Sequence, residues 1–235
     1  MTSIALIGSD GAGKTTITRM ITESSEISVK YLYMGINTES SNVALPTSRI
    51  IERLKKIRQK KSNTLHAKEA NHDFRQIRKR TVMGKIRAVA RLAHRLAEEW
   101  YRQLFAWLYQ IQGYIVLYDR HFLFDFAVPL DEGSRRFLTD RMHRWCVCHL
   151  YPRPDLTIYL DAPAEILFAR KGECGLEGLE LRRQAFMQQG KHTPNFVQVD
   201  ATQPLDEVYA EVMHHILSFL KDHTKSTLQK DGIRR

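Results

Sequence analysis

Eight residues near the start of the sequence have the types and spacing of a phosphate-binding loop. The segment Gly8-Ser9-Asp10-Gly11-Ala12-Gly13-Lys14-Thr15 fits the pattern G-x-x-x-x-G-K-[ST], and an apolar run precedes it. Glycines let successive backbone N–H groups turn inward around phosphate oxygens, and a helix that starts there adds positive potential. The Lys14 ammonium can reach the β- and γ-phosphates, and the Thr15 hydroxyl can coordinate Mg²⁺. The pattern predicts a nucleoside triphosphate site formed by Gly8 to Thr15 and the adjoining Thr16.

A second pair of residues with suitable chemistry, Asp119-Arg120, follows the apolar run Tyr114–Tyr118. At the carboxyl end of a central parallel strand, side chains project into the crevice where ligands bind. An Asp there can hold Mg²⁺ through water, and an Arg can clamp a phosphate with two N–H groups. The alternative is an ordinary surface ion pair after a strand. The sequence has no N-K-x-D guanine-reading motif, which disfavours a GTPase.

Five short apolar runs are the expected strands, and helical patterns separate them. Runs of this kind are typical of strands covered on both faces, and the alternation predicts repeated βα units with a parallel sheet. A helix of roughly 30 residues is expected to end at Gly113, because apolar residues recur every three or four positions. Three glycines in Gly172–Gly178 indicate a mobile loop. The expected strands are Ile4–Ile7, Val29–Tyr33, Tyr114–Tyr118, Leu156–Leu160 and Phe196–Val199. Of the other expected helices, the first starts at Gly13 or Lys14 and runs to about Ser25, and the later ones are Arg135–His149 and Leu205–Leu220.

The positive charge is concentrated in one part of the sequence. The 235 residues carry a net charge of +10, of which Arg49–Arg102 supplies +12 and the remainder −2. This basic segment could be a solvated helix face, attract an anionic acceptor, or contact nucleic acid or an anionic membrane. We expect one domain over residues 1–222, with a basic helical insertion at about 39–102, and a frayed polar tail at 223–235.

Composition excludes several classes of protein. Apolar residues make up 43% and charged residues 26%, so the chain is not disordered as a whole. No run approaches the roughly 18 apolar residues of a membrane span. Three cysteines in a chain of this length indicate a reducing compartment, so we expect a cytoplasmic protein.

Four segments of the sequence resemble the thymidylate kinase family of nucleoside monophosphate kinases. They are GSDGAGKTT, YDRH, RPDLTIYLDAPAEILFARKG and VDATQPLDEV, in the family's order. The resemblance implies an α/β P-loop NTPase fold with three α/β/α layers, a five-stranded parallel sheet in the order 2-3-1-4-5, and a lid. It also implies transfer of the γ-phosphoryl group of ATP, with Mg²⁺, to a nucleoside monophosphate, for which dTMP is the best single guess.

The resemblance assigns roles to individual residues. Asp10 matches an acidic residue that contacts the acceptor's sugar hydroxyl, and Asp119-Arg120 matches the pair beside Mg²⁺ and the acceptor phosphate. The cations that flank the glycine-rich segment look like those of the family's lid, and they are Arg170, Lys171, Arg182 and Arg183. The phosphate loop has no cation among Ser9–Ala12, and this favours a catalytic cation in the lid. Asp200–Leu205 matches the loop that borders adenine. The expected catalytic residues are Lys14, Asp119, Arg120, Arg170, Arg182 and Arg183; the acceptor residues are Asp10, Arg49 and Arg120; and the metal ligands are Thr15 and Asp119.

The acceptor half departs from the family. Where bacterial members of the family carry the motif R-E-P-G-G-T, this sequence has Tyr33-Met34-Gly35-Ile36-Asn37. Where the family has an Arg near its base-stacking residue, this sequence has Glu98 and Glu99. Stacking on a base could come from Trp100, Tyr101 or Phe122. Two alternatives stay open: a kinase of the same fold acting on a phosphorylated sugar or lipid, and a non-enzymatic ATP-binding module whose basic arm binds nucleic acid. The family is commonly dimeric, so the partners implied are ATP, a small anionic acceptor and a possible second copy of the chain.

Overall fold

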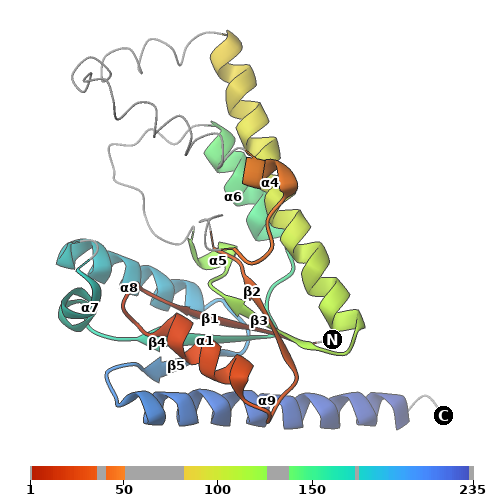
Figure 1. Cartoon of the computed structure of the whole chain (residues 1–235), viewed down its shortest axis with the longest axis vertical. Helices are drawn as coiled ribbons and strands as arrows, with labels where there is room; N and C mark the ends of the chain where they lie inside the picture. Colours follow the sequence, from red (N-terminus) through yellow and green to blue (C-terminus); the bar gives the residue numbers. More distant parts are fainter. Residues whose placement is uncertain (1, 36–40, 51–81, 126–137, 173–174, 233–235) are drawn as a thin grey trace.

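The computed structural model describes residues 2–35, 41–50, 82–125, 138–172 and 175–232. Five strands form one parallel sheet in the order β2-β3-β1-β4-β5, with helices on both of its faces (Figure 1). This confirms the predicted α/β fold and strand order. The strands are β1 (Ser3–Gly8), β2 (Val29–Tyr33), β3 (Ile115–Asp119), β4 (Leu156–Asp161) and β5 (Phe196–Asp200).

Alternate residues of the central strand β1 enter two separate apolar clusters. Ile4 and Leu6 belong to a cluster with buried residues of α1 and α9, and Ala5 and Ile7 belong to one with residues of α4, α5 and α6. This follows from the two-residue period of a strand, whose successive side chains point to opposite faces. The helices are α1 (Lys14–Glu23), α4 (Val82–Ile111), α5 (Phe122–Asp125), α6 (Leu138–Leu150), α7 (Ala164–Lys171), α8 (Leu176–Gly190) and α9 (Leu205–Gly232).

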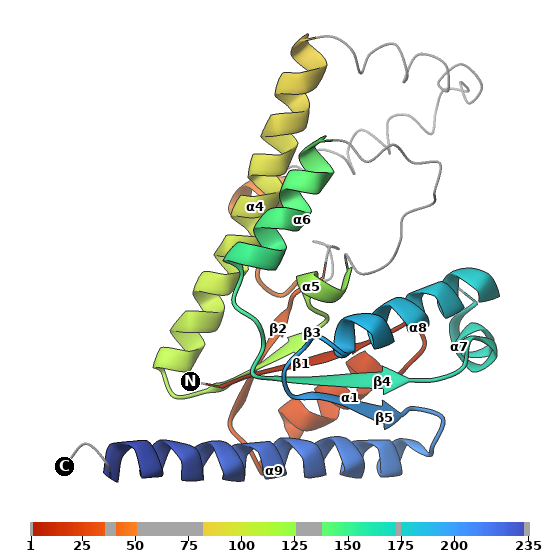
Figure 2. The same ribbon diagram turned by 180° about the vertical axis from the view of Figure 1, so that it is seen from behind.

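The strands and the long helix match the sequence predictions closely. Helix α4 has 30 residues, as its apolar periodicity indicated, and it projects beyond the sheet together with α6 (Figures 1 and 2). Helix α9 continues past the predicted end at Leu220 as far as Gly232. Fraying of residues 223–235 and the domain boundaries remain predictions, and residues 51–81 of the basic insertion lie outside the described part.

The glycine-rich loop is shorter than predicted. Helix α8 begins at Leu176, so Gly178 is helical rather than part of a loop. The reason is Leu179, whose side chain is buried in the core cluster beside α1 and α9. Burial of a leucine outweighs the cost of about 1 kcal/mol for glycine in a helix. Among the described residues, no helix is both long enough and apolar enough to span a membrane.

Candidate active site

The loop between β1 and α1 has a backbone conformation that favours glycine. Gly11 and Gly13 have φ angles of +92° and +86°. A Cβ atom at Gly11 would lie 2.8 Å from the backbone oxygen of Leu167, while Gly13 has open space around it. Gly13 precedes α1, and no side chain of the described residues caps that helix. The first N–H groups of α1 therefore remain available to an anion.

Lys14 is buried at the base of this loop. Its Nζ donates a hydrogen bond to the backbone oxygen of Ser9 at 2.7 Å. Burial lowers the pKa of Lys14 to about 8, and the nearby Arg120 charge acts in the same direction. An ammonium group in this position is incompletely compensated, so a phosphate that entered the loop would stabilise its charged form.

Three further cations converge on Asp10, in the middle of the loop. Arg120, at the end of β3, donates a hydrogen bond to one oxygen of Asp10. Arg182 of α8 lies 3.3 Å from the other oxygen, and Lys171 of α7 lies 3.9 Å from the first. Burial alone would raise the pKa of Asp10, but the charges of Arg120 and Lys14 outweigh it, so the pKa is lowered.

Asp119 supplies a second carboxylate at the same place. The Tyr31 hydroxyl donates to its Oδ2 atom at 3.2 Å. Its Oδ1 atom is buried and has no hydrogen-bond partner in the part of the chain that the structure describes. Burial raises the pKa of Asp119, against the charges of Lys14 and Arg120. Among the described residues, four cations thus surround these two carboxylates, and their excess positive charge favours an anionic ligand.

An oxygen such as Asp119 Oδ1 suits a hydrated magnesium ion. A buried acceptor without a donor is costly, and a water molecule carried by Mg²⁺ would satisfy it. Thr15 is exposed at the first turn of α1, where its hydroxyl can serve as a direct ligand. The side chains present therefore fit Mg²⁺.

The backbone of Arg120 is strained. Its φ angle of +66° lies in the left-handed region, which residues other than glycine rarely occupy. Its N–H donates to the oxygen of Leu6 in β1, which holds the turn in place. Gly35, just after β2, packs on the side chain, since a Cβ there would lie 2.7 Å from Arg120 Cδ. The position of the guanidinium is thus fixed from two sides.

The predicted lid cations divide into two groups. Arg182 and Lys171 reach the phosphate loop, as described above. The adjacent Arg183 instead makes two hydrogen bonds to Asp161 at the end of β4, at 2.7 and 2.9 Å. Arg170 donates to the backbone oxygen of Ala201, in the segment predicted to border adenine, at 2.9 Å. The structure therefore brings Arg182 to the loop and places Arg183 and Arg170 elsewhere.

Arg49, the other predicted acceptor residue, lies in a separate cleft. This cleft has a volume of about 390 Å³, and Tyr101 of α4 contributes to its wall. Of the three aromatic residues considered for stacking, Tyr101 lines this cleft, Trp100 packs on Tyr151 and Phe122 is buried. The cleft is lined by Asn42, Val43, Ala44, Pro46, Arg49, Tyr101, Phe105 and Tyr109.

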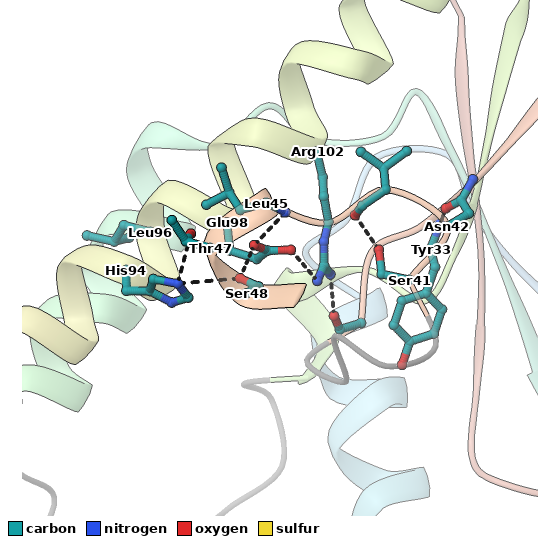
Figure 3. A network of polar contacts seen from close by, with 12 residues as sticks. Tyr33, Ser41, Asn42, Leu45, Thr47, Ser48, His94, Leu96, Glu98 and Arg102 are labelled. Atoms are coloured by element: carbon teal, nitrogen blue, oxygen red, sulfur yellow. Dashed lines mark hydrogen bonds and ion pairs between the residues drawn. The ribbon is translucent and has the colours of Figure 1, made fainter. Parts of the chain in front are cut away.

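Sequence reasoning missed Arg102. This buried side chain donates to the oxygen of Gly35 at 2.7 Å and to Glu98 Oε1 at 3.1 Å (Figure 3). The other Glu98 oxygen accepts from the Ser48 hydroxyl at 2.6 Å and the Leu45 N–H at 3.0 Å. The four-residue spacing of Glu98 and Arg102 is visible in the sequence, but the contact with Gly35 is not. Arg102 thus fixes the residue that packs on Arg120.

The fold and the glycine loop define an α/β P-loop NTPase. Over 115 residues the chain is 36% identical to a probable thymidylate kinase of Archaeoglobus fulgidus, covering 46% of this chain and 56% of that protein. Over 126 residues it is 26% identical to a thymidylate kinase of Thermosipho africanus, covering 49% and 59%. These matches support a thymidylate kinase-like family assignment for the chain.

Both matches are partial. The chain spans a little more than half the length of these two curated relatives. No protein-family model matches it.

Proposed function

We propose that this chain is an ATP-dependent phosphotransferase of the thymidylate kinase type, which moves the γ-phosphoryl group of ATP to a nucleoside monophosphate. The names of the two relatives support a kinase, and dTMP is the best single acceptor. One observation carries the proposal: among the described residues, the cations Lys14, Arg120, Lys171 and Arg182 gather at the glycine loop around the two carboxylates of Asp10 and Asp119. Such an excess of cations matches the demands of phosphoryl transfer.

The donor is bound by the phosphate loop. Backbone N–H groups of Gly11 to Thr15 and the Lys14 ammonium hold the β- and γ-phosphates of ATP. Thr15 and Asp119 would hold Mg²⁺, which would supply neutralising charge at the phosphate oxygens. Lys14 thus orients the γ-phosphorus toward the acceptor.

The acceptor phosphate lies on Arg120. One of its oxygens attacks the γ-phosphorus, the bond between that phosphorus and the β–γ bridging oxygen breaks, and its electron pair leaves on ADP. Arg182 and Lys171 stabilise the equatorial oxygens as the group transfers. Asp10 holds both cations near the loop before substrates bind and then contacts the acceptor's sugar. Arg170 and Arg183 contribute by fixing α7 and α8, and Arg49 is the candidate for a more distant part of the acceptor.

A panel assay tests this function. The full chain, with ATP and Mg²⁺, is offered each common nucleoside monophosphate, and ADP release is measured. We expect release that depends on dTMP, and none from a Lys14→Ala preparation. If ATP binds but none of the monophosphates in the panel causes ADP release, the result would contradict a nucleotide acceptor and favour the sugar or lipid alternative. Salt-sensitive nucleic-acid binding without turnover would favour the non-enzymatic module.

A further inference from the structure

The cleft at Arg49 lies between α4 and the segment 41–50. Its volume of about 390 Å³ is at the lower end of the range for small-molecule sites. Val43, Pro46 and Arg49 contribute to one wall, and rings of α4 form the other. None of the described residues that line the cleft is acidic or belongs to the phosphate loop. The cleft thus has room for a small ligand, and its chemistry differs from that of the phosphate loop.

Three aromatic rings form the α4 wall of the cleft. Tyr101, Phe105 and Tyr109 follow one another at steps of four residues, so they lie on one face of the helix. The ring centroids of Tyr101 and Phe105 are 5.1 Å apart, and those of Phe105 and Tyr109 are 6.2 Å apart, both pairs edge-to-face. All three residues are partly exposed. Contiguous rings of this kind favour a flat aromatic ligand, which can pack on them stacked or edge-to-face.

Arg49 supplies the charge of the cleft. It is exposed, and it forms no ion pair with a carboxylate in the described part of the chain. A guanidinium group can bind one carboxylate or phosphate with two parallel hydrogen bonds. The hydroxyl groups of Tyr101 and Tyr109 provide further donors on the opposite wall. One cation beside an aromatic wall suits a ligand with a single anionic group.

The wall that carries Arg49 is held in place from two sides. Asn42 forms two hydrogen bonds to the backbone of the outermost strand, β2, at 2.8 and 3.2 Å. On the other side, the Ser48 hydroxyl and the Leu45 N–H both donate to Glu98 of α4, at 2.6 and 3.0 Å (Figure 3). The cleft is therefore formed before a ligand binds, and little ordering is needed on binding.

The cleft extends away from the phosphate loop. Its far end is Tyr109, whose backbone oxygen accepts a hydrogen bond from the residue that precedes β3. Arg120, in contrast, follows the carboxyl end of the same strand. Along α4, Arg102 contacts Gly35 beside Arg120, whereas the neighbouring Tyr101 points about 100° away and lines the cleft. The cleft is thus a second site on the same chain.

We propose that this cleft binds a small molecule that combines a flat aromatic ring with one carboxylate or phosphate group. The ring packs on the aromatic wall of α4, and Arg49 binds the anionic group. This site is independent of the proposed function, because no residue assigned to ATP or to the acceptor phosphate lines it. A contact of Arg49 with a distant part of the acceptor is the competing interpretation, and the variants below separate the two.

Calorimetric titration of the full chain with 1-naphthoate and with 1-naphthyl phosphate tests the ligand class. We expect one site per chain with a dissociation constant of about 1 mM or lower for the preferred anion, which assigns a carboxylate or a phosphate. 1-Naphthamide keeps the ring without the charge, and cyclohexanecarboxylate keeps the charge without the aromatic ring. Each should bind at least about tenfold more weakly. No binding of either aromatic anion, or equal binding of all four compounds, would overturn the proposal.

Charge variants locate the bound probe. Arg49→Gln should weaken binding of the preferred anion by about tenfold or more, because it removes a charged hydrogen-bond donor. Arg91→Gln is the matched control, since Arg91 is an exposed arginine of α4 outside the cleft. Arg120→Ala should leave the affinity within about threefold. Loss of binding in Arg120→Ala would place the probe at the phosphate loop and overturn the proposal, as would unchanged binding in Arg49→Gln.

Removal of the middle ring tests the aromatic wall. Phe105→Ala should weaken binding of the same probe by roughly three- to tenfold. Phe168→Ala is the matched control, at a phenylalanine of α7 that is 44% exposed. Tyr101→Leu, with the same expected effect, is a second variant in case circular dichroism shows that Phe105→Ala does not fold. Wild-type affinity in the folded ring variants would overturn the proposal.

Discussion

Two polar clusters lie near the carboxyl ends of β2 and β3, and they differ in charge and exposure. At the phosphate loop, the side chains of Arg120 and Asp10 are 27% and 15% exposed, and among the described residues the cations outnumber the carboxylates. In the network at α4, the side chains of Arg102 and Glu98 are 1% and 5% exposed, and one cation meets one carboxylate. The first cluster also has a strained residue, Arg120. Both clusters contain a buried polar atom without a hydrogen-bond partner among the described residues, Asp119 Oδ1 in the first and Arg102 Nε in the second.

The difference indicates which cluster binds a ligand and which holds the structure together. Excess charge, partial exposure and backbone strain are features of a site that is completed by a substrate. A buried pair with matched charge is a structural contact, and its hydrogen bonds offset part of the cost of burying it. The two clusters meet at Gly35, whose oxygen accepts from Arg102 and whose Cα packs beside Arg120. The structural cluster therefore positions the ligand-binding one.

Removal of Lys14 should have the largest effect on activity. Lys14→Ala deletes the buried ammonium that faces the phosphates, and we expect turnover to fall by about 10³ or more, measured as ADP formation. Lys191→Ala, at an exposed lysine after α8, is the matched control. A Lys14→Ala enzyme with the wild-type turnover rate would contradict the assignment of Gly8 to Thr15 as the phosphate-binding loop.

Removal of Arg120 should have the second-largest effect on activity. Arg120→Ala loses the contact to the acceptor phosphate, so we expect kcat/KM for the acceptor to fall by about 10²–10³. Arg120→Lys should recover only part of this, because a lysine cannot donate two parallel N–H groups to one phosphate. An unchanged kcat/KM in Arg120→Ala would place this residue outside the site.

The α4 network should affect stability more than ATP binding. Glu98→Gln leaves the Arg102 charge buried and uncompensated, which we expect to cost about 3–5 kcal/mol of unfolding free energy in urea titrations. Glu98→Leu combined with Arg102→Met removes both charges and should restore much of that loss. The affinity of the folded protein for ADP should stay within about threefold. A Glu98→Gln protein of wild-type stability would remove the distinction between the two clusters.

Proton uptake should accompany ATP binding. The pKa of Lys14 is lowered to about 8 in the free protein, mainly by burial, so near pH 8 roughly half of the molecules carry a neutral amine. Bound phosphate favours the ammonium and raises this pKa, so binding takes up protons and affinity falls as the pH rises above 8. Calorimetry at pH 8 in two buffers of different ionisation enthalpy should give different heats. Identical heats would contradict this account of Lys14.

The sequence predicted the features that depend on local pattern. The glycine loop, the strands and the 30 residues of α4 follow from spacing and apolar periodicity over short stretches. It did not predict which lid cation faces the loop, because Arg182 and Arg183 are neighbours that point about 100° apart on a helix. It also missed Arg102, whose partner Gly35 lies 67 positions away and is brought near only by the fold.

The central claim is that the glycine loop and its cations bind the phosphates of ATP with Mg²⁺. Calorimetric titration of the full chain with ATP, with and without Mg²⁺, tests it most directly. We predict one binding site per chain in the presence of Mg²⁺, with clearly weaker binding when the metal is removed by a chelator. No measurable heat of ATP binding at any Mg²⁺ concentration would contradict the account.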